Sequence, residues 1–177
     1  YLRLLSLDKQ AHFGKLSVTD FVESIKSNDV LKHFDIAKQI SFFENLKDNS
    51  DEIAQIRKIY AEADKGKSMV LGVTGTGGSG KSSLIDEIIG RFIAYTENVN
   101  IGVLAIDPSK TKTGGALLGD RIRYNQIYND RVYFRSFATR NSMNELSTAI
   151  KDSIAVLKSC GFDIIIVETS GIGQGDS

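Results

Sequence analysis

Residues 75–82 fit the pattern G-x-x-x-x-G-K-[ST], in which each fixed residue serves phosphate binding. Backbone N–H groups of such a loop point at the phosphates, the lysine reaches the β- and γ-phosphates, and the serine hydroxyl binds Mg²⁺. Glycine is needed where the backbone approaches the phosphates closely or adopts a positive φ. A glycine-rich turn without a ligand is the alternative. The candidate nucleotide-binding residues of the loop are Gly77, Gly78, Ser79, Gly80, Lys81 and Ser82.

Two regular elements must hold this loop in place. Residues 68–73 form a short apolar run, which predicts a buried strand that enters the loop. Residues 83–92 carry apolar side chains at helical spacing, which predicts a helix that leaves it. The positive N-terminal end of that helix would add to the attraction for an anion.

The same alternation of strand and helix continues along the chain. Apolar runs predict further strands at residues 100–106, at 131–135, where the strand should be shorter, and at 162–167. Asn141 can cap a helix that Gly161 ends. Continuous apolar strands alternating with amphipathic helices predict an α/β fold, with a mostly parallel sheet covered by helices on both faces. The carboxyl ends of all strands should then share one edge, where ligands bind.

Acidic residues come directly after two of the predicted strands. Asp107 follows the second strand and Glu168 the fourth. Mg²⁺ prefers oxygen ligands, and Ser82 and Glu168 could supply a hydroxyl and a carboxylate from two sides. Glu168 also opens an acid-x-x-Gly sequence, typical of a switch in which the backbone of Gly171 senses the γ-phosphate. A solvated carboxylate at a strand end is the alternative interpretation of Glu168.

Residues 107–120 form a second candidate functional loop. It holds the only proline of the chain and a Gly-Gly pair, and long loops in compact domains are usually functional or disordered. We interpret it as a nucleotide-responsive switch, with a plain connector as the alternative. Asp107 could hold the attacking water or a metal-bound water, and Asp120 could be a further acid near the metal. Arg121 and Arg123 could stabilise charge at the phosphates or lie on the surface.

Residues 1–66 have a different pattern. Apolar residues at helical spacing predict helices around residues 17–25, 30–46 and 53–60. We expect residues 1–66 to be a helical linker or docking segment and residues 67–177 to be the nucleotide-binding domain.

The composition of the chain excludes several classes of protein. The 22 basic and 22 acidic residues balance, so nothing indicates a nucleic-acid or anionic-membrane surface. A single cysteine, Cys160, excludes an internal disulfide framework and suits a reducing, cytoplasmic compartment. No apolar run approaches the roughly 20 residues that span a bilayer. Because the chain begins at Tyr1 and ends within a motif at Ser177, we expect a fragment of a longer protein whose sheet is incomplete.

Together these motifs resemble the G domains that chaperone adenosylcobalamin-dependent acyl-CoA mutases. These domains are P-loop GTPases of the signal-recognition and metallochaperone class. The resemblance covers about residues 68–177 and is carried by residues 73–83, 106–109, 112–123 and 167–174. The amino-acid sequence of residues 112–123 is more similar to that of fused isobutyryl-CoA mutase than to that of the stand-alone chaperone of methylmalonyl-CoA mutase.

The resemblance implies GTP and GDP as nucleotides, Mg²⁺ as the metal, and adenosylcobalamin bound elsewhere in the parent protein. It implies partners as well: cobalamin-binding and substrate-binding mutase domains, in the same chain or as a separate subunit, and a homodimer. It implies that residues 78–83, including Ser83, line the phosphates and that Arg123 contacts the nucleotide. The implied metal set is Ser82, Asp107, Asp120 and Glu168. The Asn-Lys-x-Asp signature that reads guanine is absent from this sequence, so guanine specificity is inherited from the resemblance.

The leading hypothesis is a GTP-hydrolysing switch domain of an acyl-CoA mutase. A water would attack the γ-phosphate in line, with Lys81 neutralising developing charge and Asp107 as the second catalytic residue. A nucleotide-gated binding module with little turnover is a second hypothesis. A nickel-delivering GTPase would need a Cys/His cluster, which one cysteine and two distant histidines do not favour. A small-molecule kinase is disfavoured by the acid-x-x-Gly sequence.

Overall fold

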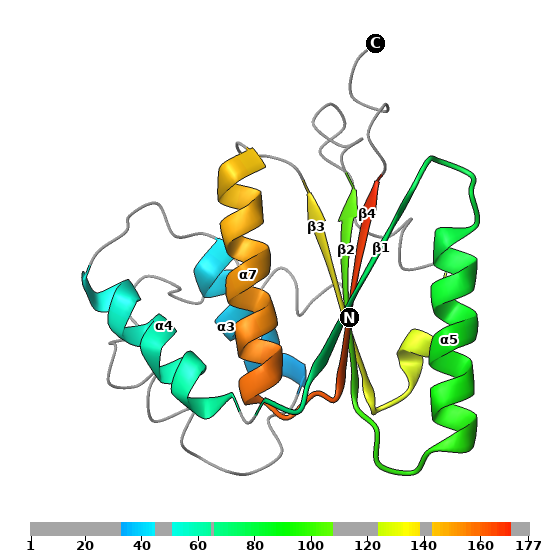
Figure 1. The fold of residues 1–177 in the computed structure, drawn as a ribbon, viewed down its shortest axis with the longest axis horizontal. Coiled ribbons are helices and arrows are strands. Elements are labelled where there is room, and N and C mark those ends of the chain that lie inside the picture. The colour runs from blue at the N-terminus through cyan, green and yellow to red at the C-terminus, as the bar shows by residue number, and fades with distance from the viewer. Residues whose placement is uncertain (1–32, 45–50, 65, 108–123, 139–142, 171–177) are drawn as a thin grey trace, which may run out of the picture.

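The computed structural model describes residues 33–44, 51–64, 66–107, 124–138 and 143–170. Within them, a parallel four-stranded sheet lies between helices on both faces (Figure 1), which confirms the predicted α/β fold. The strands are β1 (Met69–Gly75), β2 (Ile101–Asp107), β3 (Val132–Ala138) and β4 (Ile164–Ser170). The helices are α3 (His33–Glu44), α4 (Asp51–Ala63), α5 (Lys81–Tyr95), the short 3₁₀ helix η2 (Gln126–Tyr128) and α7 (Met143–Ser159).

The strand order β1-β4-β2-β3 places β4 between β1 and β2. Every pairing is parallel, so the carboxyl ends of the strands meet at one edge of the sheet. In this register Glu168 of β4 lies beside Val73 on one side and Ala105 on the other. The sheet therefore delivers the acid to the same edge at which β1 runs into the phosphate loop.

Three strand predictions need correction. The run that forms β1 was expected to be buried, but β1 is the edge strand of the described sheet, and Met69, Val70 and Leu71 are 65%, 44% and 37% exposed. An apolar run does not distinguish an edge strand from a central one, because that depends on pairing far along the chain. The third strand, expected to be shorter, has seven residues like the others. The fourth extends to Ser170, so Glu168 lies within the strand and not after it.

Each face of the sheet has its own hydrophobic cluster. The cluster beneath α5 includes Ile85, Ile89, Ile101, Tyr124 and Ile166. The cluster on the opposite face includes Ile40, Tyr60, Leu104, Leu157 and Ile165 and unites the sheet with α3, α4 and α7. A fully buried aliphatic side chain stabilises a fold by about 1.5–3 kcal/mol, so both helical layers are firmly held.

The helical prediction for the N-terminal segment is confirmed where the structure describes it, at α3 and α4. Both helices pack against α7 and share its hydrophobic cluster. The domain boundary between residues 66 and 67 stays a prediction. At the C-terminal end of α7, Gly161 has a φ of +80° and terminates the helix as expected.

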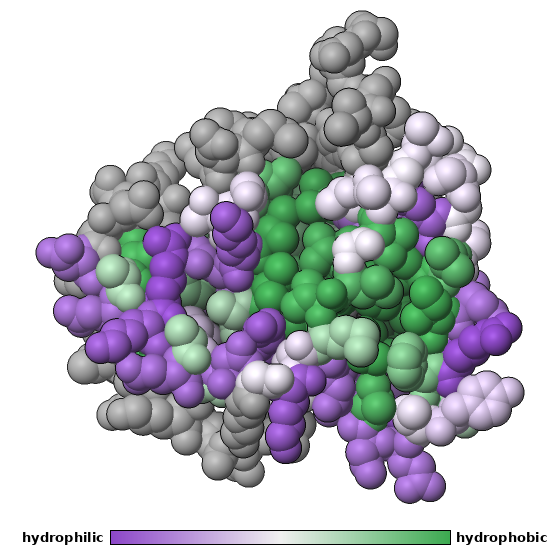
Figure 2. All heavy atoms as spheres, in the orientation of Figure 1, coloured by the Kyte–Doolittle hydropathy of each residue, from purple (hydrophilic) through white to green (hydrophobic). Residues whose placement is uncertain are grey.

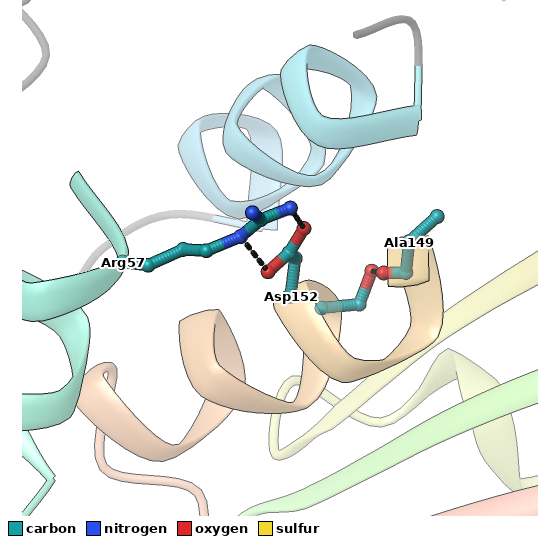
Figure 3. A network of polar contacts seen from close by, with 4 residues as sticks. Arg57, Ala149 and Asp152 are labelled. Atoms are coloured by element: carbon teal, nitrogen blue, oxygen red, sulfur yellow. Dashed lines mark hydrogen bonds and ion pairs between the residues drawn. The ribbon is translucent and has the colours of Figure 1, made fainter. Parts of the chain in front are cut away.

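An ion pair fixes α4 on α7 (Figure 3). Arg57 donates from Nε to Oδ1 of Asp152 at 2.9 Å and from Nη2 to Oδ2 at 2.8 Å. This hydrogen bonding raises the pKa of the Arg57 guanidinium. Two parallel hydrogen bonds give the contact a defined geometry, which a single long-range attraction would not.

Replacing Asp152 with alanine should lower the free energy of unfolding by about 1–2 kcal/mol. The change removes both hydrogen bonds to a charged group, and the loss is moderated because the Arg57 side chain is 35% exposed and can be hydrated. Urea unfolding followed by circular dichroism measures the effect. Glu62→Ala is the matched control, since its pair with Lys58 is 3.9 Å long and exposed and should contribute less than about 0.5 kcal/mol. An equal decrease in the free energy of unfolding in the two variants would contradict a stabilising role for the pair of Arg57 with Asp152.

Candidate functional site

The phosphate loop joins the end of β1 at Gly75 to the start of α5 at Lys81. Gly78 has a φ of +75° and Gly80 a φ of +83°, conformations that side-chain-bearing residues rarely adopt. These two glycines therefore shape the turn itself. The amide of Leu84 donates to the carbonyl of Gly80 at 2.9 Å and closes the first turn of the helix. The loop thus delivers the chain to a helix N-terminus, which attracts anions.

Lys81 folds back onto the loop that precedes it. Its Nζ donates to the carbonyl of Gly75 at 2.6 Å and to that of Thr76 at 2.8 Å. The hydroxyl of Ser79 also donates to Thr76, at 2.8 Å, and tightens the turn. The ammonium group therefore lies at the mouth of the loop, beside the backbone that would surround a phosphate.

Glu168 accepts hydrogen bonds from two side chains that lie far from it in the sequence. The hydroxyl of Ser82, on α5, donates to Oε1 of Glu168 at 2.9 Å. The phenol of Tyr124 donates to Oε2 of the same carboxylate. The structure thus brings together Ser82 and Glu168, which the sequence placed 86 residues apart.

Tyr124 and Asp86 were not among the residues predicted from the sequence. Tyr124 is only 2% exposed and lies four residues after the predicted loop of residues 107–120. Asp86 accepts hydrogen bonds from the backbone amides of Asn125 and Gln126 at 2.8 and 2.9 Å. A tyrosine after a loop usually packs in a core, and one aspartate on a helix is usually solvated, so neither carried a local signal.

The other predicted site residues are only partly described. Asp107 is the last residue of β2, at the same edge of the sheet as the phosphate loop, and only its backbone is described. Asp120, Arg121, Arg123 and Gly171 lie outside the described residues. The roles assigned to them stay predictions.

The donor set at this edge suits a hard cation. A serine hydroxyl and a carboxylate are oxygen ligands, and Mg²⁺ typically takes one or two protein oxygens and completes its shell with phosphates and water. Across the described residues, no group of three or more His, Cys, Asp or Glu side chains lies close enough to hold a metal. Burial raises the pKa of the Cys160 thiol to about 11, so it is protonated at neutral pH and a poor metal ligand. No helix in the described part of the chain is long and apolar enough to cross a membrane.

A glycine-rich phosphate loop that runs from a parallel strand into a helix defines the P-loop class of nucleotide-binding folds. Within that class, residues 36–177 match the family described as methylmalonyl-CoA mutase-associated GTPase MeaB. The chain belongs to this family.

Several curated sequences and a solved structure resemble the chain. A fused isobutyryl-CoA mutase of Geobacillus kaustophilus is 50% identical over 164 residues, which are 90% of this chain and 15% of that protein. A putative GTPase of Pyrococcus horikoshii is 42% identical over 158 residues, 89% of this chain and 47% of that protein. The crystal structure of a LAO/AO transport system kinase shares the fold, with a TM-score of 0.63 at 21% identity, over 91% of this chain and 46% of that one. The chain therefore spans a small part of the fused mutase and about half of the GTPase.

Proposed function

We propose that the chain is a Mg²⁺-dependent switch domain that binds and hydrolyses GTP and serves an acyl-CoA mutase of the isobutyryl type. The observation that carries the proposal is the contact of Ser82 with Glu168 beside the phosphate loop. It joins the residue after the loop lysine to an acid at the carboxyl edge of the sheet, where a nucleotide-bound metal would lie. Membership of the GTPase family and the likeness to fused mutases support the choice of nucleotide and partner.

The residues of this chain would act on the nucleotide in distinct ways. Amides of the loop, from Gly77 to Ser83, would hold the phosphates, and Lys81 would exchange two carbonyl partners for phosphate oxygens. Ser82 and Glu168, with Asp107 and Asp120, would hold Mg²⁺. Bound Mg²⁺ would neutralise charge on the phosphates during hydrolysis.

The remaining roles concern the attacking water and the response to nucleotide. Asp107 would orient the water for in-line attack, as its place at the end of β2 allows. Arg123 and the backbone of Gly171 would contact the nucleotide and respond when the γ-phosphate leaves.

By analogy with the fused relatives, the partners of the domain would be cobalamin-binding and substrate-binding mutase domains of the same chain. Adenosylcobalamin would be bound by those domains, and nucleotide turnover here would govern its loading and protection. A separate mutase subunit, as the family description suggests, is the alternative arrangement. We further propose a cytoplasmic homodimer.

Nucleotide binding by the full-length protein tests the proposal. Fluorescent GTP should bind at least about tenfold more tightly than fluorescent ATP, and Mg²⁺ should tighten the binding. Equal affinity for the two nucleotides would contradict a GTPase and favour a kinase. Single-turnover hydrolysis with and without the mutase domains separates the switch from a binding module, which would show negligible turnover in both.

A further inference from the structure

Tyr124 is placed to control the orientation of Glu168. A carboxylate at the end of a flexible side chain can rotate, and each hydrogen bond to it restricts that rotation. Ser82 donates to Oε1 of Glu168 and the Tyr124 phenol donates to Oε2, so each carboxylate oxygen has its own donor.

The tyrosine ring is itself immobilised. It belongs to the hydrophobic cluster beneath α5, with Ile85 and Ile89, and it is 2% exposed. Its centroid lies 5.2 Å from that of Phe134 on β3, in a tilted arrangement. A buried phenol that is packed on all sides delivers its hydroxyl to a fixed point.

The backbone that directly follows Tyr124 is hydrogen-bonded to α5, the helix that carries Ser82. Asp86 lies one turn after Ser82 on α5, and residues at this spacing share a helix face. Its carboxylate accepts both amides of Asn125 and Gln126, and Oδ2 also accepts the side-chain amide of Asn125 at 3.0 Å. The two donors to Glu168 are therefore held at a fixed separation through one helix.

We propose that Tyr124 is a positioning residue for Mg²⁺, holding Glu168 so that its other oxygen faces the Ser82 hydroxyl. The inference rests on the proposed function, because it names a further residue for the same nucleotide site. Tyr124 lies four residues after the end of the predicted switch loop, residues 107–120, so its phenol would also link the chain that follows this loop to Glu168.

Tyr124→Phe in the full-length protein tests this role, because it removes the hydroxyl and keeps the ring. The readout is the Mg²⁺ concentration that half-maximally slows release of a fluorescent GDP analogue from protein first stripped of metal with EDTA. We expect about a tenfold increase in that concentration, the usual effect of losing a group that orients a metal ligand. GDP affinity in EDTA should change less than about twofold, since the phosphate loop is untouched.

Tyr60→Phe is the matched control. Tyr60 is 1% exposed and its phenol donates to Oε1 of Gln39 at 2.8 Å, in the cluster on the other face of the sheet. This variant loses the same atom from an equally buried ring and should leave the Mg²⁺ dependence unchanged. An unchanged Mg²⁺ midpoint in Tyr124→Phe, or an equal shift in both variants, would overturn the inference. Failure of the wild-type protein to bind GDP, or to respond to Mg²⁺, would instead overturn the proposed function.

Discussion

Replacing Lys81 with alanine should lower the rate of GTP hydrolysis by the full-length protein at least about 100-fold. Loss of one fixed charge donor at a developing oxyanion costs this much or more in enzymes. The charge that this change removes lies at the phosphate loop, because Nζ of Lys81 is 2.6 and 2.8 Å from two carbonyl oxygens of that loop. Phosphate release under saturating and subsaturating GTP measures kcat and kcat/KM.

A matched control separates this effect from a general loss of positive charge. Lys67 is exposed and precedes β1, at the end of the strand opposite the phosphate loop. Lys67→Ala removes the same charge and should change turnover less than about twofold, since exposed charges beyond a Debye length are screened. Retention of half the turnover or more by Lys81→Ala, with an unchanged circular dichroism spectrum, would exclude the proposed hydrolytic mechanism.

Replacing Gly102 with alanine should lower the free energy of unfolding by about 1–3 kcal/mol. Gly102 lies in β2, paired with β3 and β4, and an added Cβ would come within 2.7 Å of Cδ1 of Leu157 on α7. Leu157 is fully buried, so its methyl group has no free space to enter. The helix would have to move away from the sheet or the leucine adopt a strained rotamer. The midpoint of urea unfolding reports the loss.

Gly90, on the other side of the sheet, is the matched control, and its replacement with alanine should raise the free energy of unfolding instead of lowering it. An added Cβ at Gly90, in the middle of α5, would meet Gln126 at 3.5 Å, an ordinary contact. Gly90→Ala should therefore stabilise the protein by about 0.5–1 kcal/mol, because alanine favours a helix over glycine. If Gly102→Ala were as stable as the wild type, the close packing of α7 on β2 would be contradicted.

The sequence predicted those features that local pattern encodes. Apolar runs located all four described strands, and the spacing around Lys81 located the phosphate loop and the helix after it. The approach of Ser82 to Glu168 was also predictable, because parallel strands present their carboxyl ends at one edge.

Features that depend on long-range pairing were not predictable in this way. The exposure of β1 follows from its place in the strand order, which no run of six residues encodes. Tyr124 reaches Glu168 across 44 residues, and Asp86 reaches Asn125 across 39. Each is an ordinary residue in its own segment, and its role arises only from the tertiary contact.

The edge position of β1 has a mechanical consequence for the nucleotide site. Among the described strands, β1 is hydrogen-bonded to β4 alone, so the phosphate loop is carried by a strand supported along one side. No described strand pairs with its other side, where Met69, Val70 and Leu71 are exposed and Figure 2 shows a hydrophobic area over the sheet and α5. A further strand paired along that side would support β1, and with it the start of the phosphate loop at Gly75. Such a strand would act on the position of the loop from outside it, through β1 alone.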